Sequence, residues 1–189
     1  MKKYNSEKGN SYIFFEKNTP LTRANVILDW TFFCLIIISG VLVFFGILIF
    51  RNTIIPLGPL FIGTSFVSIL FSLGLWIFLR NNLSTISILF SGFVIGGGLF
   101  YFSFLYINKI FPLSTSKSFT YKVQEKGSLA KGSRGNCNNP YVVIYINGIE
   151  KQLIFTCDLK NKSENSQKVV LEIYDGFFGY PFISKKELI

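Results

Sequence analysis

The sequence contains no histidine, and only 15% of its 189 residues are charged. Histidine is the commonest general base, proton shuttle and metal ligand at neutral pH. Its absence excludes Ser–His and Cys–His nucleophiles, so few familiar catalytic arrangements are open to the chain. Soluble domains are about one quarter charged, and the low charge argues against an ordinary soluble domain. We therefore expect no metal site and no cofactor, and we favour a non-enzymatic role over an enzyme.

Charge is scarcest between about Val26 and Ile107, where the hydrophobic residues are concentrated. Three uncharged stretches here are followed by Arg51, Arg80 and Lys109. Each is long enough for a bilayer core, which needs about 20 helical residues. Because the connections are short, consecutive helices should be antiparallel neighbours. The sequence thus predicts an α-helical membrane protein with a three-helix transmembrane hairpin bundle, its helices at about residues 26–50, 54–79 and 83–107.

A cleaved signal peptide is the alternative interpretation of the first stretch, since Lys2 and Lys3 precede it. The stretch is longer than a signal-peptide core, and Glu7 and Glu16 dilute the basic region. No small-residue cleavage site follows it. We expect an uncleaved anchor that follows a polar, basic N-terminal segment, residues 1–23.

Small residues recur at helical spacing in the second and third stretches. Thr64, Ser68 and Ser72 repeat every four residues, and so do Gly92 and Gly96. In lipid, helices associate through close backbone approach at small residues and through interhelical hydrogen bonds. These residues are therefore candidate helix-packing positions. They predict packing within the chain, with homo-oligomerisation through the same face as the alternative.

The composition changes at Ser114, which separates the helical region, 24–113, from a small extramembrane β domain, 114–189. Asn147-Gly148 between two β-rich runs is a strong hairpin signal, because both residues accept the positive φ of a type I′ turn. This turn sets Ile146 opposite Ile149. We predict four or five antiparallel strands.

The same register brings Cys137 and Cys157 close to one another. A perfect ladder would place their sulfurs on opposite faces, but an irregularity at Pro140 could bring them into bridging range. We predict a disulfide that closes a loop of about 20 residues and contributes about 3 kcal/mol. Disulfides form in oxidising compartments, so the bridge favours a β domain outside the cytoplasm. The distribution of Lys and Arg is almost even, six against five, and barely favours a cytoplasmic N-terminus.

Lys126, Lys131 and Arg134 lie in a glycine-containing loop that superficially resembles a phosphate-binding loop. Ser133 occupies the position that requires lysine, and no strand-to-helix context surrounds it, which argues against a nucleotide site. The three cations are candidates for contact with anionic lipid headgroups or with a partner, although a solvated loop is the best single interpretation. We expect no nucleic-acid partner.

Aromatic residues fill the C-terminal segment, at Phe177, Phe178, Tyr180 and Phe182. Aromatic side chains bury large apolar surfaces in cores and also favour membrane interfaces. We predict that these side chains complete the core of the β domain. The alternative is that they lie against the membrane interface or dock a partner.

Two functional hypotheses fit these features, with an enzyme carrying an external site as a third. The first is a membrane-anchored accessory or interaction protein that presents its β domain outside the cytoplasm, beside a larger membrane complex. The second is an oligomeric small transporter or channel subunit, disfavoured because the apolar cores contain no charged residue. The expected partners are the lipid bilayer and either such a complex or a second copy of the chain. The expected location is a bacterial inner membrane.

Overall fold

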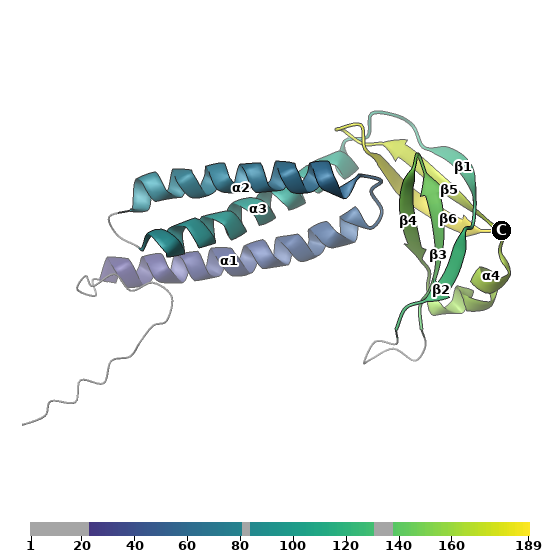
Figure 1. Ribbon diagram of the computed structural model, residues 1–189, viewed down its shortest axis with the longest axis horizontal. Helices are drawn as coiled ribbons and strands as arrows, with labels where there is room; N and C mark the ends of the chain where they lie inside the picture. The colour runs from purple at the N-terminus through teal and green to yellow at the C-terminus, as the bar shows by residue number, and fades with distance from the viewer. Residues whose placement is uncertain (1–22, 81–83, 131–137) are drawn as a thin grey trace, which may run out of the picture. The chain divides into compact units, whose positions relative to one another are not determined.

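Three long apolar helices followed by two small antiparallel sheets make up the described part of the chain (Figure 1). The computed structural model describes residues 23–80, 84–130 and 138–189. Its long helices are α1 (Arg23–Phe50), α2 (Leu57–Leu79) and α3 (Thr85–Ile110). Each is long and apolar enough to cross a membrane. The predicted combination of apolar helices and a small β domain is confirmed at this level.

The second helix begins later than predicted, at Leu57 rather than at residue 54. Ile54 lies outside the helix, and its backbone N–H donates a hydrogen bond to the carbonyl of Pro181, at 2.8 Å. Its side chain is buried in the β domain. Pro59 lies in the first helical turn, where the missing N–H leaves no intrahelical hydrogen bond unmade. The residues before Leu57 therefore belong to the β domain by their contacts.

Packing divides the chain into two compact units whose boundaries fall inside the helices. Among the described residues, one unit combines those up to Val41 with those of Thr64–Phe100, and the other combines Leu42–Gly63 with those of Tyr101–Ile189. The predicted domain boundaries follow composition, whereas these units follow contacts. The second unit holds the β domain together with the ends of the helices that adjoin it.

The β domain contains two three-stranded antiparallel sheets (Figure 1). The first has the strand order β1 (Lys117–Lys122), β5 (Lys168–Asp175), β6 (Pro181–Leu188). The second has the order β2 (Glu125–Ser128), β3 (Pro140–Ile146), β4 (Ile149–Ile154). Between β4 and β5 lie the short helices η1 (Cys157–Leu159) and α4 (Lys160–Asn165).

Alternating hydrophobic residues build the core between the two sheets. Side chains two positions apart on a strand point to the same face. In β3 the buried face carries Val142, Ile144 and Ile146. In β5 it carries Val169, Leu171 and Ile173. Both sets belong to one cluster of buried residues, so the sheets pack face to face.

The β3–β4 hairpin has the predicted turn. Asn147 has φ 52° and Gly148 has φ 78°. Ile146 pairs with Ile149. The predicted register is therefore confirmed, since the Asn-Gly turn fixes it locally.

The strand count was wrong: the described residues form six strands rather than four or five. The missed strand is β2, which pairs with β3. Its Lys-Gly-Ser sequence lacks the alternation that marks a strand. A side chain at Gly127 would collide with the ring of Tyr141 on β3, so the tyrosine covers this position. The local sequence carries no sign of that contact.

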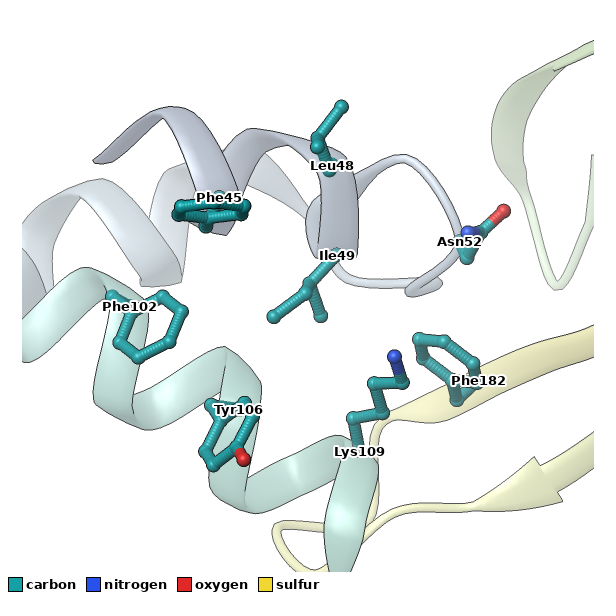
Figure 2. Close-up of a pocket in the computed structure, with 8 residues that line it drawn as sticks. All are labelled: Phe45, Leu48, Ile49, Asn52, Phe102, Tyr106, Lys109 and Phe182. Atoms are coloured by element: carbon teal, nitrogen blue, oxygen red, sulfur yellow. The ribbon is translucent and has the colours of Figure 1, made fainter. Parts of the chain in front are cut away.

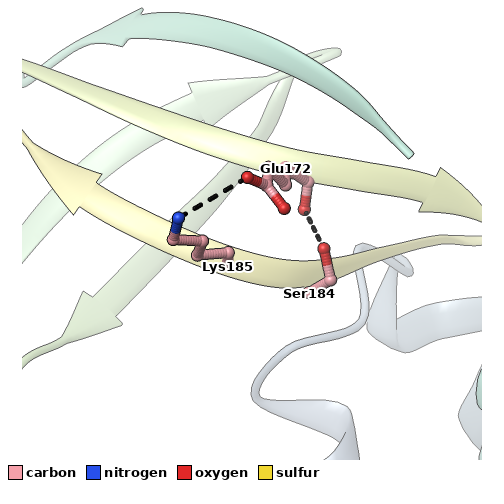
Figure 3. A network of polar contacts seen from close by, with 3 residues as sticks. All are labelled: Glu172, Ser184 and Lys185. Atoms are coloured by element: carbon pink, nitrogen blue, oxygen red, sulfur yellow. Dashed lines mark hydrogen bonds and ion pairs between the residues drawn. The ribbon is translucent and has the colours of Figure 1, made fainter.

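A bulge interrupts the pairing of β5 with β6 (Figure 3). The register shifts between Glu172 and Ile173, and Ser184 is the extra residue on β6. The Ser184 hydroxyl donates a hydrogen bond of 3.0 Å to the Glu172 carbonyl. The Glu172 carboxylate lies 3.8 Å from the Lys185 ammonium in an exposed ion pair, which contributes little to stability.

Candidate functional site

The end of α3 is fastened to the β5–β6 turn by Asn108. Its side chain is completely buried. The Asn108 amide nitrogen donates a hydrogen bond to the Tyr180 carbonyl at 2.9 Å, and its oxygen accepts one from the Phe178 backbone N–H at 3.0 Å. The Asn108 backbone carbonyl also accepts a hydrogen bond from the N–H of Phe177, at 3.3 Å. A buried amide that is bonded at both ends fixes the turn against the helix.

The β5–β6 turn can pack against Asn108 because glycine occupies the position where the turn comes closest to that residue. A side chain at Gly176 would collide with the side chain and the backbone of Asn108. Gly179 has φ 76°, a conformation that glycine adopts without strain. Just beyond α3, the Ser114 hydroxyl accepts a hydrogen bond from the Asp175 backbone N–H at 2.9 Å.

A second attachment joins the end of α1 to β4 through Lys151. The side chain of Lys151 is only 8% exposed. Its ammonium donates hydrogen bonds to the carbonyls of Phe50, at 3.0 Å, and Thr53, at 2.7 Å. The last carbonyls of a helix lack intrahelical partners, and a cation is favoured at that end. Lys151 therefore acts as a cap that a distant strand supplies to α1.

Burial changes the acidity of two lysines in this region. It lowers the pKa of Lys151 to about 8. It also lowers the pKa of Lys186, and the nearby charge of Arg51 lowers it further. Lys186 donates to the carbonyl of Ile154. The sheets thus supply one lysine, Lys151, that contacts the end of α1, and a second, Lys186, that is close enough to interact with the charge of Arg51.

The segment that follows α1 adds to the edge of β6. Thr53 forms an isolated antiparallel bridge with Phe182. The Ile183 N–H donates to the Asn52 carbonyl at 2.8 Å. Together with Asn108 and Lys151, this pairing holds the β domain directly on the ends of α1 and α3 rather than on a flexible tether.

The C-terminal aromatic residues divide between core and surface. Phe182 is buried beside Ile49 and Leu105. Phe178 stacks on Phe104 of α3 with ring centroids 4.5 Å apart, yet it remains 42% exposed. The prediction that all four complete the core of the β domain is therefore wrong. They lie at the junction because the turn that carries them packs against α3.

A groove of about 390 Å³ lies between the ends of α1 and α3 (Figure 2). Its walls are mainly apolar, and its polar residues Asn52 and Lys109 lie at the ends of the helices beside Phe182 of the β domain. The lining residues are Phe45, Leu48, Ile49, Asn52, Phe102, Tyr106, Lys109 and Phe182. The volume lies within the range of small-molecule sites.

Lys109 is the charged residue of the groove. Its side chain rises from α3 beside Phe182, with the ammonium 5.7 Å from the ring centroid (Figure 2). Within the described ranges no carboxylate forms an ion pair with Lys109 or with Arg51. Within the same ranges no three Cys, Asp or Glu side chains are grouped so that they could hold a metal ion.

The structure brings the candidate helix-packing residues together inside the first unit. A side-chain carbon at Gly92 would lie 2.7 Å from the α-carbon of Ser72, and one at Gly96 would lie 2.7 Å from Phe71. The Ser72 hydroxyl donates to the carbonyls of Ser68, at 2.8 Å, and Leu89, at 3.1 Å. The α2 and α3 backbones therefore approach closely within one chain.

Thr64 and Ser68 continue the same face of α2. The Ser68 hydroxyl donates to the Thr64 carbonyl at 2.7 Å. Ser39 on α1, which was not among the candidates, donates to the carbonyl of Val94 at 2.8 Å. Serine hydroxyl groups therefore donate hydrogen bonds between helices in this unit, from α1 to α3 through Ser39 and from α2 to α3 through Ser72.

The remaining candidates fall partly outside the described residues. Cys137, Lys131 and Arg134 lie outside them, so the disulfide and the basic loop stay predictions. The sulfur of Cys157 lies 3.3 Å from the side-chain oxygen of Asn139. Lys126 lies on β2, and its ammonium donates to the backbone carbonyl of Glu164 at 2.8 Å.

Sequence reasoning missed the two residues that fasten the junction. Lys151 carried a signal, because it lies between Ile149 and Leu153 on the inward face of a strand. A lysine at such a position indicates a buried cation that needs acceptors. The sequence around Asn108 gave no comparable sign of its role, apart from its position at the end of an apolar stretch.

Comparison with protein-family models, with curated proteins and with solved structures finds no match to this chain.

Proposed function

We propose that the chain is a non-enzymatic membrane-anchored interaction protein that presents its β domain at a fixed position above the membrane surface. The observation that carries this proposal is the fastening of the β domain to the helix ends by Asn108 and Lys151. A domain that only needed to be retained near a membrane could hang from a flexible linker. Two buried polar attachments instead fix which face of the domain meets a partner.

The surfaces of the helices support insertion in a bilayer. Only 17% of the apolar window of α1, 17% of that of α2 and 39% of that of α3 are buried inside the protein. A long helix that is hydrophobic on all sides requires either a protein core or lipid around it. A lipid bilayer would cover the exposed apolar faces of all three helices.

We further propose that the β domain lies outside the cytoplasm, with Cys137 and Cys157 bridged. Three spans place the N-terminus and the β domain on opposite sides of the membrane. The orientation is tested with a membrane-impermeant thiol reagent on intact cells, with and without reductant, using a Cys34→Ser background. Labelling of residues 137 and 157 that appears only after reduction supports both proposals. Labelling that requires permeabilised cells refutes the external placement.

The interaction role is tested by affinity purification of the full chain from its own membranes in mild detergent. An Asn108→Ala variant, which releases the turn, is compared with Asn161→Ala on α4. Recovery of the same larger membrane complex with the native chain and Asn161→Ala, but not with Asn108→Ala, supports the proposal. A lone homo-oligomer that conducts ions or solutes in liposomes would instead support the transporter or channel alternative.

A further inference from the structure

The groove between α1 and α3 has two chemically different ends. Phe45, Leu48 and Phe102 line it on the side of the helices. Asn52 and Lys109 line it at the helix ends, where the chain enters the β domain. Along the helices, the apolar end of the groove lies on the side of the bilayer core, where acyl chains are found. The polar end lies at the helix ends, where lipid headgroups are found. The match depends on the membrane placement made under the proposed function.

The polar end of the groove is positively charged. Lys109 extends into it over Phe182, and Arg51 immediately precedes Asn52 in the chain. Among the described residues no carboxylate forms an ion pair with Lys109. Asp175, at the end of β5, instead accepts a hydrogen bond of 3.2 Å from the hydroxyl of Ser114. The ammonium of Lys109, which lines the groove, is thus available to an anion that arrives from outside the chain.

We propose that this groove binds one acidic phospholipid, with its phosphate at Lys109 and Asn52 and its acyl chains against Phe45, Leu48 and Phe102. The lysine supplies the charge and the asparagine amide supplies a hydrogen-bond donor. A free phosphate would leave the apolar wall uncovered. A neutral lipid would leave the ammonium without a counter-charge.

A simpler role for Lys109 predicts a different result. A lysine at the end of α3 complements the helix dipole and reaches into the interface with any lipid. Such a residue does not select among headgroups. Selectivity for an acidic headgroup, dependent on the charge at residue 109, is therefore the property that separates the two roles.

The experiment uses native mass spectrometry of the full chain in a mild non-ionic detergent. Dioleoylphosphatidylglycerol and dioleoylphosphatidylcholine are titrated separately onto the native protein and onto Lys109→Gln, Lys109→Arg and Leu48→Trp. Lys160→Gln on α4 is the matched control, because it removes the same charge from an exposed position that does not line the groove. Thermal unfolding of every variant in the same detergent checks that it is folded.

The native chain should bind phosphatidylglycerol more tightly than phosphatidylcholine. Lys109→Gln should weaken phosphatidylglycerol binding about fivefold, as expected for one basic contact at a membrane surface. Lys109→Arg and Lys160→Gln should retain the preference. Leu48→Trp, which fills the apolar end, should weaken the binding of both lipids.

Equal binding of the two lipids by the native chain would overturn the inference, and so would equal effects of Lys109→Gln and Lys160→Gln. Resistance of the chain to extraction from membranes by alkaline carbonate is measured in parallel. A chain that resists extraction but shows no lipid preference refutes the groove inference alone. A chain that is extracted refutes the membrane placement, and with it both proposals.

Discussion

The side-chain oxygen of Asn108 accepts a hydrogen bond from the backbone N–H of Phe178, 70 residues later in the chain, at 3.0 Å. The same amide donates to Tyr180, so both of its ends are used. A residue at the end of an apolar helix thereby holds the turn of a β hairpin. The relationship makes the helix end and the β domain one structural unit.

Replacement of Asn108 by alanine should release the β5–β6 turn. It leaves the Phe178 N–H without its partner, which costs about 1–3 kcal/mol for a buried group. It also removes one of the two donors to the Tyr180 carbonyl, which keeps the hydrogen bond from the Gly176 N–H at 3.1 Å. We expect about 3 kcal/mol of lost local stability. Hydrogen exchange of the backbone amide of Phe178, measured in detergent, should accelerate about a hundredfold. The exposed Asn161→Ala should leave it unchanged, and equal protection in both variants would contradict the prediction.

Gly176 should tolerate alanine less well than Gly179. At residue 176 the new side chain collides with Asn108, and relief of the collision requires movement of the helix end. At residue 179 the space is open, and the cost is the strain of a positive φ, about 1–2 kcal/mol. Thermal unfolding in detergent should show the larger loss for Gly176→Ala. Gly58→Ala in α2, which also has open space, is the control and should lose nothing; a larger loss at residue 179 would refute the order.

Local chemistry explains what could be predicted from the sequence. The apolar stretches reveal the three helices, because length and composition decide whether a helix suits a membrane. The Asn147-Gly148 pair fixes the β3–β4 register without help from the rest of the chain. These features are encoded within a few residues of where they appear.

The junction could not be predicted because its partners are remote in sequence. Lys151 contacts carbonyls 101 and 98 residues earlier, and Asn108 contacts a carbonyl 72 residues later. Strand β2 was missed for the same reason, since Tyr141 on another strand covers Gly127. The inward position of Lys151 indicated burial but not which carbonyls it would reach.

Gly92 should be more sensitive to substitution than Gly74, although both lie in apolar helices. A side chain at Gly92 meets the backbone of Ser72, whereas Gly74 has open space. Gly92→Ala should therefore separate α2 from α3 and lower the thermal unfolding midpoint in detergent. Gly74→Ala should keep or raise it, because alanine favours helix by about 1 kcal/mol over glycine.

The oligomeric state distinguishes the two interpretations of the Gly92 face. Because Ser72 of the same chain already covers Gly92, the substitution should leave the mass of the detergent-solubilised particle unchanged. A change in that mass without a change in the unfolding midpoint would favour an interface between copies.

Lys151 should make stability rise with pH above 8. Burial lowers its pKa to about 8 in the folded protein, against 10.5 ordinarily. Between these values the unfolded chain binds more protons than the folded chain, so stability increases with pH. From pH 8 to 9.5 we expect a gain of about 1–2 kcal/mol, measured by chemical denaturation in detergent. Measurements stop at pH 9.5 because tyrosine begins to ionise near pH 10.

The contribution of Lys151 is identified by how steeply the free energy of unfolding changes with pH, rather than by its value at one pH. Lys186 also has a lowered pKa and contributes a slope of the same sign. Lys151→Met removes the titrating group, so it should reduce the slope without abolishing it. The free energy of unfolding will also change at every pH, because the carbonyls of Phe50 and Thr53 lose a hydrogen-bond donor. A slope that is equal in Lys151→Met and in the native chain would show that Lys151 does not lose its proton in this range, and that its two carbonyl acceptors keep it charged.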